Sequence, residues 1–250
     1  MRLYLTAFLI FAVFVALYAF LPKNIVGQIA IALCLVFAYI PPLLTFTLWV
    51  VTLPVEKLIS RYYINDAKKV LKNRPNMTVI GVTGSYGKTT TKFILTRILS
   101  EKFNTVCTPH SFNTPMGITK VVLKYLKKHH NLLIVEMGAK QMGDIKYLCD
   151  IVKPHHAIIT GIGSQHYETF GSVENIAKTK YELIESLPQD AFAVFNGDSE
   201  NCLSLYEKCM LDNKLMVSLE TGGVVEAKNV VLGTSGTSFD LCHAGKSKKC

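Results

Sequence analysis

Acidic residues are absent from the first 53 positions of the sequence, where Arg2 and Lys23 are the only charged side chains. Residues 3–21 are almost wholly apolar, and residues 25–53 carry no charge. A membrane-spanning helix needs about 20 apolar residues, so each run is long enough to cross a bilayer. We therefore predict a transmembrane hairpin over residues 1–53.

Two other interpretations of these apolar runs fit the sequence less well. A cleaved signal peptide would end in a small-residue cleavage site, which residues 3–21 lack. A buried hairpin of a soluble domain would show a polar face, and neither run has one. Pro41 and Pro42 interrupt the second run, and we expect them to kink the helix or to end the span.

A metal-binding cysteine pattern is also lacking. The seven cysteines include no C-x-x-C pair, which argues against a structural zinc site. An odd number of cysteines without regular spacing is typical of reduced thiols in a cytosolic domain.

Positive charge is concentrated directly after the second apolar run. Residues 54–74 hold six basic side chains and two acidic ones. Such an excess beside a span marks its cytoplasmic side, and it attracts anionic lipid headgroups. We expect residues 54–75 to form a basic amphipathic linker helix, with the following domain on the cytoplasmic face of the cell membrane. A solvated helix face would look the same. Nucleic acid is not an expected partner, because the rest of the chain is nearly neutral.

Short apolar runs alternate with helical patterns from residue 77 onwards, which is typical of a parallel sheet with helices on its faces. Strands are expected at residues 77–82, 104–107, 132–135, 157–160 and 191–195, and helices at 89–102, 118–128, 144–152 and 172–187. From residue 214 the pattern turns to strands, with Ser235 and Gly236 as a hairpin turn. The predicted fold is therefore α/β: a P-loop-type, mostly parallel sheet flanked by helices over residues 76–250, preceded by transmembrane helices.

The segment GVTGSYGKTT, residues 81–90, lies between a predicted strand and a predicted helix. In that context the backbone N–H groups of the loop and helix start form a cradle for anions. Lys88 would reach the β- and γ-phosphates of ATP, and the Thr89 hydroxyl would bind Mg²⁺. The general P-loop formula has glycine where Val82 stands, and the alternative is a tight turn with a surface lysine. The candidate nucleotide-binding residues are Gly84, Ser85, Gly87, Lys88, Thr89 and Thr90.

Four further polar residues lie where sites are often found. Glu136 ends a predicted strand beside the phosphate loop, and a carboxylate suits a hard cation, although a structural role is equally compatible. His166 follows another strand in a polar loop, where a lone histidine is usually just exposed. Lys180 has the spacing of a solvated helix lysine. Asn113 lies in a loop, and its default interpretation is a turn.

Five segments, in order, resemble the Mur ligase family and its D-alanyl-D-alanine-adding branch. They are GVTGSYGKTTTKFIL, PHSFNTPMGIT, LLIVEMGAKQMGDI, HYETFGSVENIAKTKYELI and AVFNGD, across roughly residues 77–198. The T-G-x-x-G-K-T-T loop is the form that this family uses. The resemblance implies an ATP-dependent carbon–nitrogen ligase of peptidoglycan precursor synthesis. ATP activates a carboxylate acceptor as an acyl phosphate, and the amine of an amino acid or dipeptide then forms an amide.

Matching positions carry the family's site onto this chain. The resemblance implies that Lys88 and Thr89 bind phosphates and Mg²⁺, and that Glu136 and His166 hold a second Mg²⁺. Lys180 is similar to the lysine that the family carries as a carbamate, which is an oxygen ligand for a cation. In full, the expected catalytic residues are Lys88, Lys180 and His166, the expected metal ligands are Thr89, Glu136, His166 and Lys180, and Asn113 lies near the γ-phosphate.

The resemblance does not extend to the whole family pattern. The two apolar runs stand in place of the N-terminal sugar-nucleotide domain, and the C-terminal amine-binding domain does not follow. We therefore expect an incomplete ligase. The alternative is a non-catalytic membrane-bound ATP-binding protein or an inactive ligase fragment, but the joint presence of Glu136, His166 and Lys180 favours an enzyme.

Overall fold

The computed structural model describes residues 25–163, 167–219, 224–234 and 236–250. The chain divides into two compact units, one ending at Arg61 and the other beginning at Tyr62. This boundary falls within the segment 54–75 that is expected to be a linker. The first predicted span, residues 3–21, lies outside the described residues.

Helix α2 (Ile25–Lys72) contains the second apolar run. Among the described residues it is the one helix long and apolar enough to cross a membrane, with a mean hydropathy of 2.3 in its most apolar window. Of the two outcomes expected at Pro41 and Pro42, a kink or an end of the span, the second is wrong, since the helix continues through both prolines; the kink stays a prediction. A proline ring fits helical backbone angles and removes one donor, and the Thr45 hydroxyl donates to the carbonyl oxygens of both prolines at 3.0 and 2.9 Å.

The last turns of α2 belong to the second unit. Ile64 and Ala67 are buried in its core, and Val70 and Leu71 are partly buried there. These positions share one helix face, because side chains three and four residues apart lie above one another. The end of the basic segment is therefore an amphipathic helix that packs onto the α/β unit.

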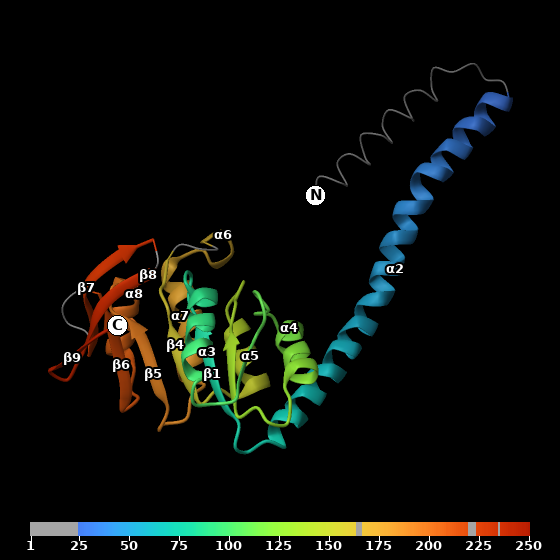
Figure 1. Cartoon of the computed structure of the whole chain (residues 1–250). Helices are drawn as coiled ribbons and strands as arrows, with labels where there is room; N and C mark the ends of the chain where they lie inside the picture. Colours follow the sequence, from blue (N-terminus) through green and yellow to red (C-terminus); the bar gives the residue numbers. More distant parts are fainter. Residues whose placement is uncertain (1–24, 164–166, 220–223, 235) are drawn as a thin grey trace. The chain divides into compact units, whose positions relative to one another are not determined.

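Among the described residues, nine strands form one sheet (Figure 1), in the order β2-β3-β1-β4-β5-β6-β7-β8-β9. Neighbouring strands pair in parallel from β2 to β7, and β8 and β9 are added antiparallel. The strands are β1 (Thr78–Thr83), β2 (Thr105–Cys107), β3 (Leu132–Glu136), β4 (His156–Ile159), β5 (Phe192–Asn196), β6 (Asn213–Ser218), β7 (Val225–Gly233), β8 (Gly236–His243) and β9 (Lys246–Lys249). This mostly parallel sheet confirms the predicted fold class.

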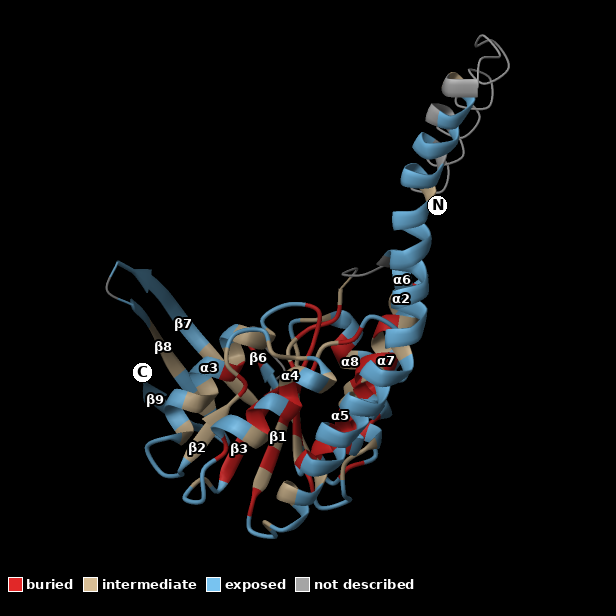
Figure 2. Ribbon diagram, turned by 90° about the vertical axis from the view of Figure 1, so that its right-hand side faces the viewer, coloured by how far each residue is buried: buried red, intermediate tan, exposed pale blue. Residues whose placement is uncertain are grey.

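Helices cover both faces of the parallel strands, which are the buried part of the unit in Figure 2. They are α3 (Lys88–Leu99), α4 (Pro115–Lys120), α5 (Asp144–Val152), α6 (Tyr167–Phe170), α7 (Val173–Glu185) and α8 (Glu200–Lys208). Along β3, Leu133 and Val135 join the large core cluster, whereas Leu132 and Ile134 join a second cluster with Leu95 of α3. This alternation follows from the two-residue period of a strand and buries β3 on both sides.

Some local elements differ from the sequence prediction. The helix expected at 118–128 is α4 followed by a π-helical turn, η1 (Val121–Tyr125), and α6 and α8 were not predicted. The expected cap of α7 is confirmed, because the Ser172 side chain accepts a hydrogen bond from the Asn175 amide at 3.1 Å. Of the predicted hairpin turn, Gly236 begins β8, and Ser235 lies outside the described residues.

Candidate functional site

The loop between β1 and α3 has two glycines whose backbone requires them. Gly87 has φ 75° and caps the N-terminus of α3. Gly84 has φ 154°, and a Cβ there would lie 2.1 Å from the Thr160 hydroxyl. Glycine adopts positive φ without steric cost and lets two backbones approach closely. The segment therefore wraps tightly over the start of α3, as the glycine-rich pattern predicts.

Ser85 locks this loop to the segment that follows β4. Its amide donates to the Gly161 carbonyl at 2.7 Å. Its hydroxyl accepts from the Gly163 amide at 3.0 Å and donates to the Gly163 carbonyl at 3.2 Å. Ser85 was predicted to bind nucleotide, and the structure shows its side chain engaged in holding the loop.

Lys88 curls back over the same loop. Its ammonium donates to the carbonyls of Gly84 at 2.7 Å and Ser85 at 3.2 Å. Burial lowers the pKa of Lys88, and the nearby Glu136 carboxylate partly opposes this shift. A half-buried cation satisfied by backbone carbonyls is well placed to exchange them for an anionic ligand, because bonds between two charged groups are the stronger ones.

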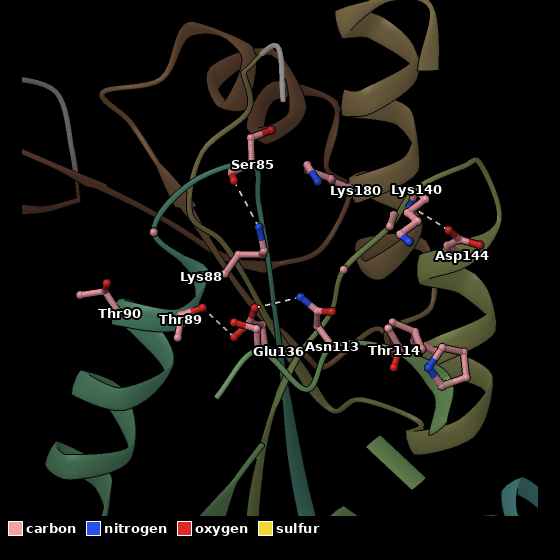
Figure 3. A pocket seen from close by; sticks show the side chains of 16 residues that line it. Ser85, Lys88, Thr89, Thr90, Asn113, Thr114, Glu136, Lys140, Asp144 and Lys180 are labelled. Carbon is pink, nitrogen blue, oxygen red and sulfur yellow. Dashed lines mark hydrogen bonds between the residues drawn. The ribbon is translucent and has the colours of Figure 1, made fainter. Parts of the chain in front are cut away.

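Glu136 is the point where three predicted residues meet (Figure 3). It lies at the end of β3, in register with Val82 of β1, and is buried. The Thr89 hydroxyl donates to its Oε2 at 2.9 Å, and the Asn113 amide donates to its Oε1 at 3.1 Å. The sheet edge thus brings together side chains from α3, from the loop after β2 and from β3, as expected for the carboxyl ends of parallel strands.

Lys180 extends from α7 toward the loop between β1 and α3 (Figure 3) and is 5% exposed. Burial lowers the pKa of Lys180 to about 8, and the neighbouring charge of Lys88 adds to the shift. No described residue accepts a hydrogen bond from its ammonium. Its spacing suggested a solvated helix lysine, and the structure corrects that interpretation. His166, the other expected ligand, lies outside the described residues.

These side chains line one pocket of about 650 Å³, a volume typical of small-molecule sites. The predicted residues Ser85, Gly87, Lys88, Thr89, Thr90, Asn113, Glu136 and Lys180 all line it. Thr114, Lys140 and Asp144 extend the wall on the far side of Asn113, and the sequence did not single them out. No cluster of three or more His, Cys, Asp or Glu side chains suited to a metal occurs among the described residues.

Lys92 is the main side chain that the sequence analysis missed. It is fully buried, and its ammonium lies 2.9 Å from Glu136 Oε2. A signal was available. Lys92 follows Lys88 by four residues on α3 and therefore shares its face, and a buried carboxylate such as Glu136 requires a partner.

Comparison with known proteins shows which family the chain resembles. Residues 82–250 match the model of the Mur ligase middle domain. The UDP-N-acetylmuramoyl-tripeptide–D-alanyl-D-alanine ligase of Synechocystis sp. is 33% identical over 205 residues, which are 77% of this chain and 44% of that enzyme.

Solved structures agree. MurF from Acinetobacter baumannii superposes with a TM-score of 0.70 at 28% identity, covering 76% of this chain and 41% of that one. MurF ligase from Thermotoga maritima in complex with ADP gives a TM-score of 0.68 at 32% identity, covering 76% and 43%. The chain spans less than half the length of these relatives. With more than half of its residues matched to the middle-domain model, the chain belongs to the Mur ligase family.

Proposed function

We propose that this chain supplies the nucleotide-binding part of an ATP-dependent carbon–nitrogen ligase of the Mur type, acting in peptidoglycan precursor synthesis. The observation that carries the proposal is the convergence of Lys88, Glu136 and Lys180 on one pocket under a glycine-rich loop. The relative from Thermotoga maritima binds ADP, which supports an adenine nucleotide here.

The pocket fits a nucleotide phosphate at the loop. Gly84 and Gly87 have positive φ, and Gly87 caps the N-terminus of α3, where the first backbone N–H groups of a helix are free to bind an anion. Lys88 would exchange its two carbonyl partners for phosphate oxygens and neutralise charge during phosphoryl transfer. Asn113, bonded to Glu136, would lie near the γ-phosphate.

The donor set also fits a hard cation in part. The Thr89 hydroxyl and the Glu136 carboxylate are 2.9 Å apart, and both are the oxygen ligands that Mg²⁺ prefers. An ammonium on Lys180 does not fit, whereas a carbamate does. The lowered pKa of Lys180, about 8, makes more of the neutral amine available for carbamylation near neutral pH. We propose two Mg²⁺ sites, with Thr89 in the first and Glu136, His166 and carbamylated Lys180 in the second; the ions would polarise the transferred phosphoryl group.

The proposed reaction begins with transfer of the γ-phosphoryl group to an acceptor carboxylate. The acyl phosphate is then attacked by the amine of an amino acid or dipeptide, which forms the amide and releases phosphate. In this chain, Lys88 would hold the phosphates and offset the negative charge that develops on them, and Glu136 and carbamylated Lys180 would hold the cation that offsets the rest. Lys140, on the far wall of the pocket, carries a positive charge where an acceptor carboxylate would enter.

We propose that the protein is anchored in the cell membrane as a multi-pass protein, with the α/β unit in the cytoplasm. Helix α2 supports this, because its charge-free part exceeds the length of a bilayer span. Apolar side chains such as Phe37 and Trp49 are exposed on it, and the basic residues that follow suit anionic lipids. Protease added to sealed cells should leave residues 76–250 intact. Cleavage there would contradict the cytoplasmic location of the α/β unit.

Nucleotide binding by the full chain in detergent tests the proposal most directly. Lys88→Ala should weaken Mg-ATP binding in calorimetry by about 100-fold or more, because it deletes the main point charge on the phosphates. Arg97→Ala is the matched control, since Arg97 is an exposed cation on the same helix, and it should bind as wild type does. Equal binding by wild type and Lys88→Ala would refute the assignment. Tight ATP binding without any phosphoryl transfer to a carboxylate would favour the non-catalytic alternative.

A further inference from the structure

The pocket contains a buried ion pair whose cation, Lys92, has no part in the proposed chemistry. The Lys92 ammonium and Glu136 Oε2 are 2.9 Å apart, with side-chain exposures of 0% and 1%. Burial of two charges is costly unless hydrogen bonds satisfy the remaining donors and acceptors. The cost of burying such a pair beside a ligand pocket therefore points to a functional role for it.

Both partners are tied to further elements. Lys92 also donates to the backbone carbonyl of His110, while Glu136 accepts from Thr89 and Asn113. Three elements are thus joined through one ammonium and one carboxylate: helix α3, the loop after β2, and the end of β3. Thr89 and Asn113 are neutral and do not compensate the negative charge of the Glu136 carboxylate. Among these three donors, Lys92 is the one that carries a positive charge.

The loop that Lys92 holds is conformationally unusual. His110 has φ 45°, in the left-handed region that non-glycine residues seldom adopt. Such a conformation persists where the surrounding contacts over-determine it, and the bond from Lys92 to the His110 carbonyl is one such contact. The same loop presents Ser111, Asn113 and Thr114 to the pocket.

We propose that Lys92 is a positioning residue: it orients the Glu136 carboxylate and fixes the loop of residues 108–114 before any ligand binds. Lys88, one turn earlier on α3, would bind the phosphates, whereas Lys92 binds the Glu136 carboxylate and the His110 carbonyl of the protein itself. The inference rests on the proposed function only in that Glu136 is taken to face Mg²⁺ bound with ATP. An ion pair that merely stabilises the fold is the competing explanation.

The first measurement separates these two roles. ATP affinity of the full chain in detergent is compared with Mg²⁺ present and with Mg²⁺ removed by EDTA. The quantity compared is the factor by which Mg²⁺ raises the ATP affinity, called here the Mg²⁺ gain. In Lys92→Met this factor should fall by about tenfold or more, the effect expected when a partner of a metal ligand is lost. The ATP affinity in EDTA should stay within about threefold of the wild-type value. Lys214→Met is the control, because Lys214 is likewise a lysine whose ammonium donates to backbone carbonyls, at 3.0 and 2.9 Å, but it forms no ion pair with Glu136 and lies four strands away from β3 in the sheet. An unchanged Mg²⁺ gain in Lys92→Met would overturn the inference, whereas a wild type that does not bind ATP would overturn the proposed function.

A second measurement needs no ligand. Hydrogen exchange of the peptide covering residues 108–114 should accelerate about tenfold or more in Lys92→Met and not in Lys214→Met. If Lys92→Met fails to fold, Lys92→Met combined with Glu136→Met removes both charges and should recover a cooperative transition. The loop should still exchange fast in that double variant, because the His110 carbonyl has lost its donor. Wild-type protection of the loop in either variant would overturn the inference.

Discussion

The parallel half of the sheet, strands β2 to β6, and its extension, strands β7 to β9, are stabilised in different ways. Strand β3 is buried along its whole length, whereas the residues of β7 from Lys228 onwards are exposed. Each half holds a lysine–glutamate pair: Lys92–Glu136 is fully buried at 2.9 Å, and Lys228–Glu226 lies at the surface at 2.8 Å with Lys228 49% exposed. Similar distances in such different surroundings have different consequences. Exposed pairs contribute little, whereas breaking a buried pair leaves an uncompensated charge.

The candidate site lies entirely in the parallel half. Its parts come from the carboxyl ends of β1 and β3 and from helices packed on both faces of those strands. A pocket whose walls are fixed by burial from two sides keeps its geometry without a ligand. The extension beyond β6 is held mainly by its backbone ladder, so we expect it to tolerate change. The predictions below test this contrast, from the largest expected effect to the smallest.

Leu133→Ala should destabilise the protein most. Leu133 is fully buried in β3, and removing a buried leucine side chain costs about 2–5 kcal/mol, including the cavity that remains. Urea unfolding of the full chain in detergent, followed by circular dichroism, measures the loss. A change below about 1 kcal/mol would mean that β3 can relax around the cavity, which a strand buried on both faces should not do.

Lys180→Met should stabilise the protein at neutral pH in buffer free of carbon dioxide. The pKa of Lys180 in the folded protein is about 8, because burial lowers it from the usual lysine pKa of 10.5. Between these values the unfolded chain binds more protons, so wild-type stability rises with pH across that window. Below pH 8 the full penalty for the buried ammonium applies, on the order of 3 kcal/mol.

Methionine removes that penalty, so the advantage of Lys180→Met should shrink from pH 8 toward pH 10.5. Lys178→Met, at an exposed position of the same helix, should show no such dependence. If the two variants respond alike to pH, Lys180 is not desolvated in solution. With bicarbonate present, wild type should regain stability that neither variant gains, because only Lys180 can then carry the carbamate.

The elements of the parallel half could be predicted because their signals are local. Alternation of apolar runs, the glycine loop and the serine cap at Ser172 all act within a few residues, and they place Glu136 beside the phosphate loop through a general rule of parallel sheets. The uninterrupted helix through Pro41 and Pro42 could not be read from proline spacing alone, because an apolar helix tolerates the loss of single donors.

The side-chain network of the site could be predicted only in part. The contact between Ser85 and Gly163 joins residues far apart in the sequence, and it forms only once β1 and β4 are paired. The burial of Lys180 likewise depends on how α7 packs against the sheet. Local spacing carries neither fact, and for this reason it assigned Lys180 to the solvent.

Gly84→Ala and Gly236→Ala compare the two parts of the sheet at positions of similar φ. Gly84 has φ 154° and Gly236 has φ 150°, so an alanine is similarly strained at both. A Cβ at Gly84 would lie 2.1 Å from the Thr160 hydroxyl, whereas no atom of the described residues beyond the chain neighbours lies within 4 Å of one at Gly236. Gly84→Ala should therefore cost about 1–3 kcal/mol more, as overpacking does, and should also weaken ATP binding. Equal losses in urea unfolding would mean that the loop at Thr160 moves aside freely.

Leu232→Ala should have the smallest effect. Leu232 is 81% exposed in β7 of the extension, and its substitution removes little apolar surface from the folded state beyond what the unfolded chain also exposes. The expected change in unfolding free energy is within about 0.5 kcal/mol, against several times that for the same substitution at Leu133. A loss as large as that of Leu133→Ala would show that this face of β7 is covered in solution. The contrast between the two halves of the sheet would then hold only for the isolated chain, and the extension would be a contact surface in its own right.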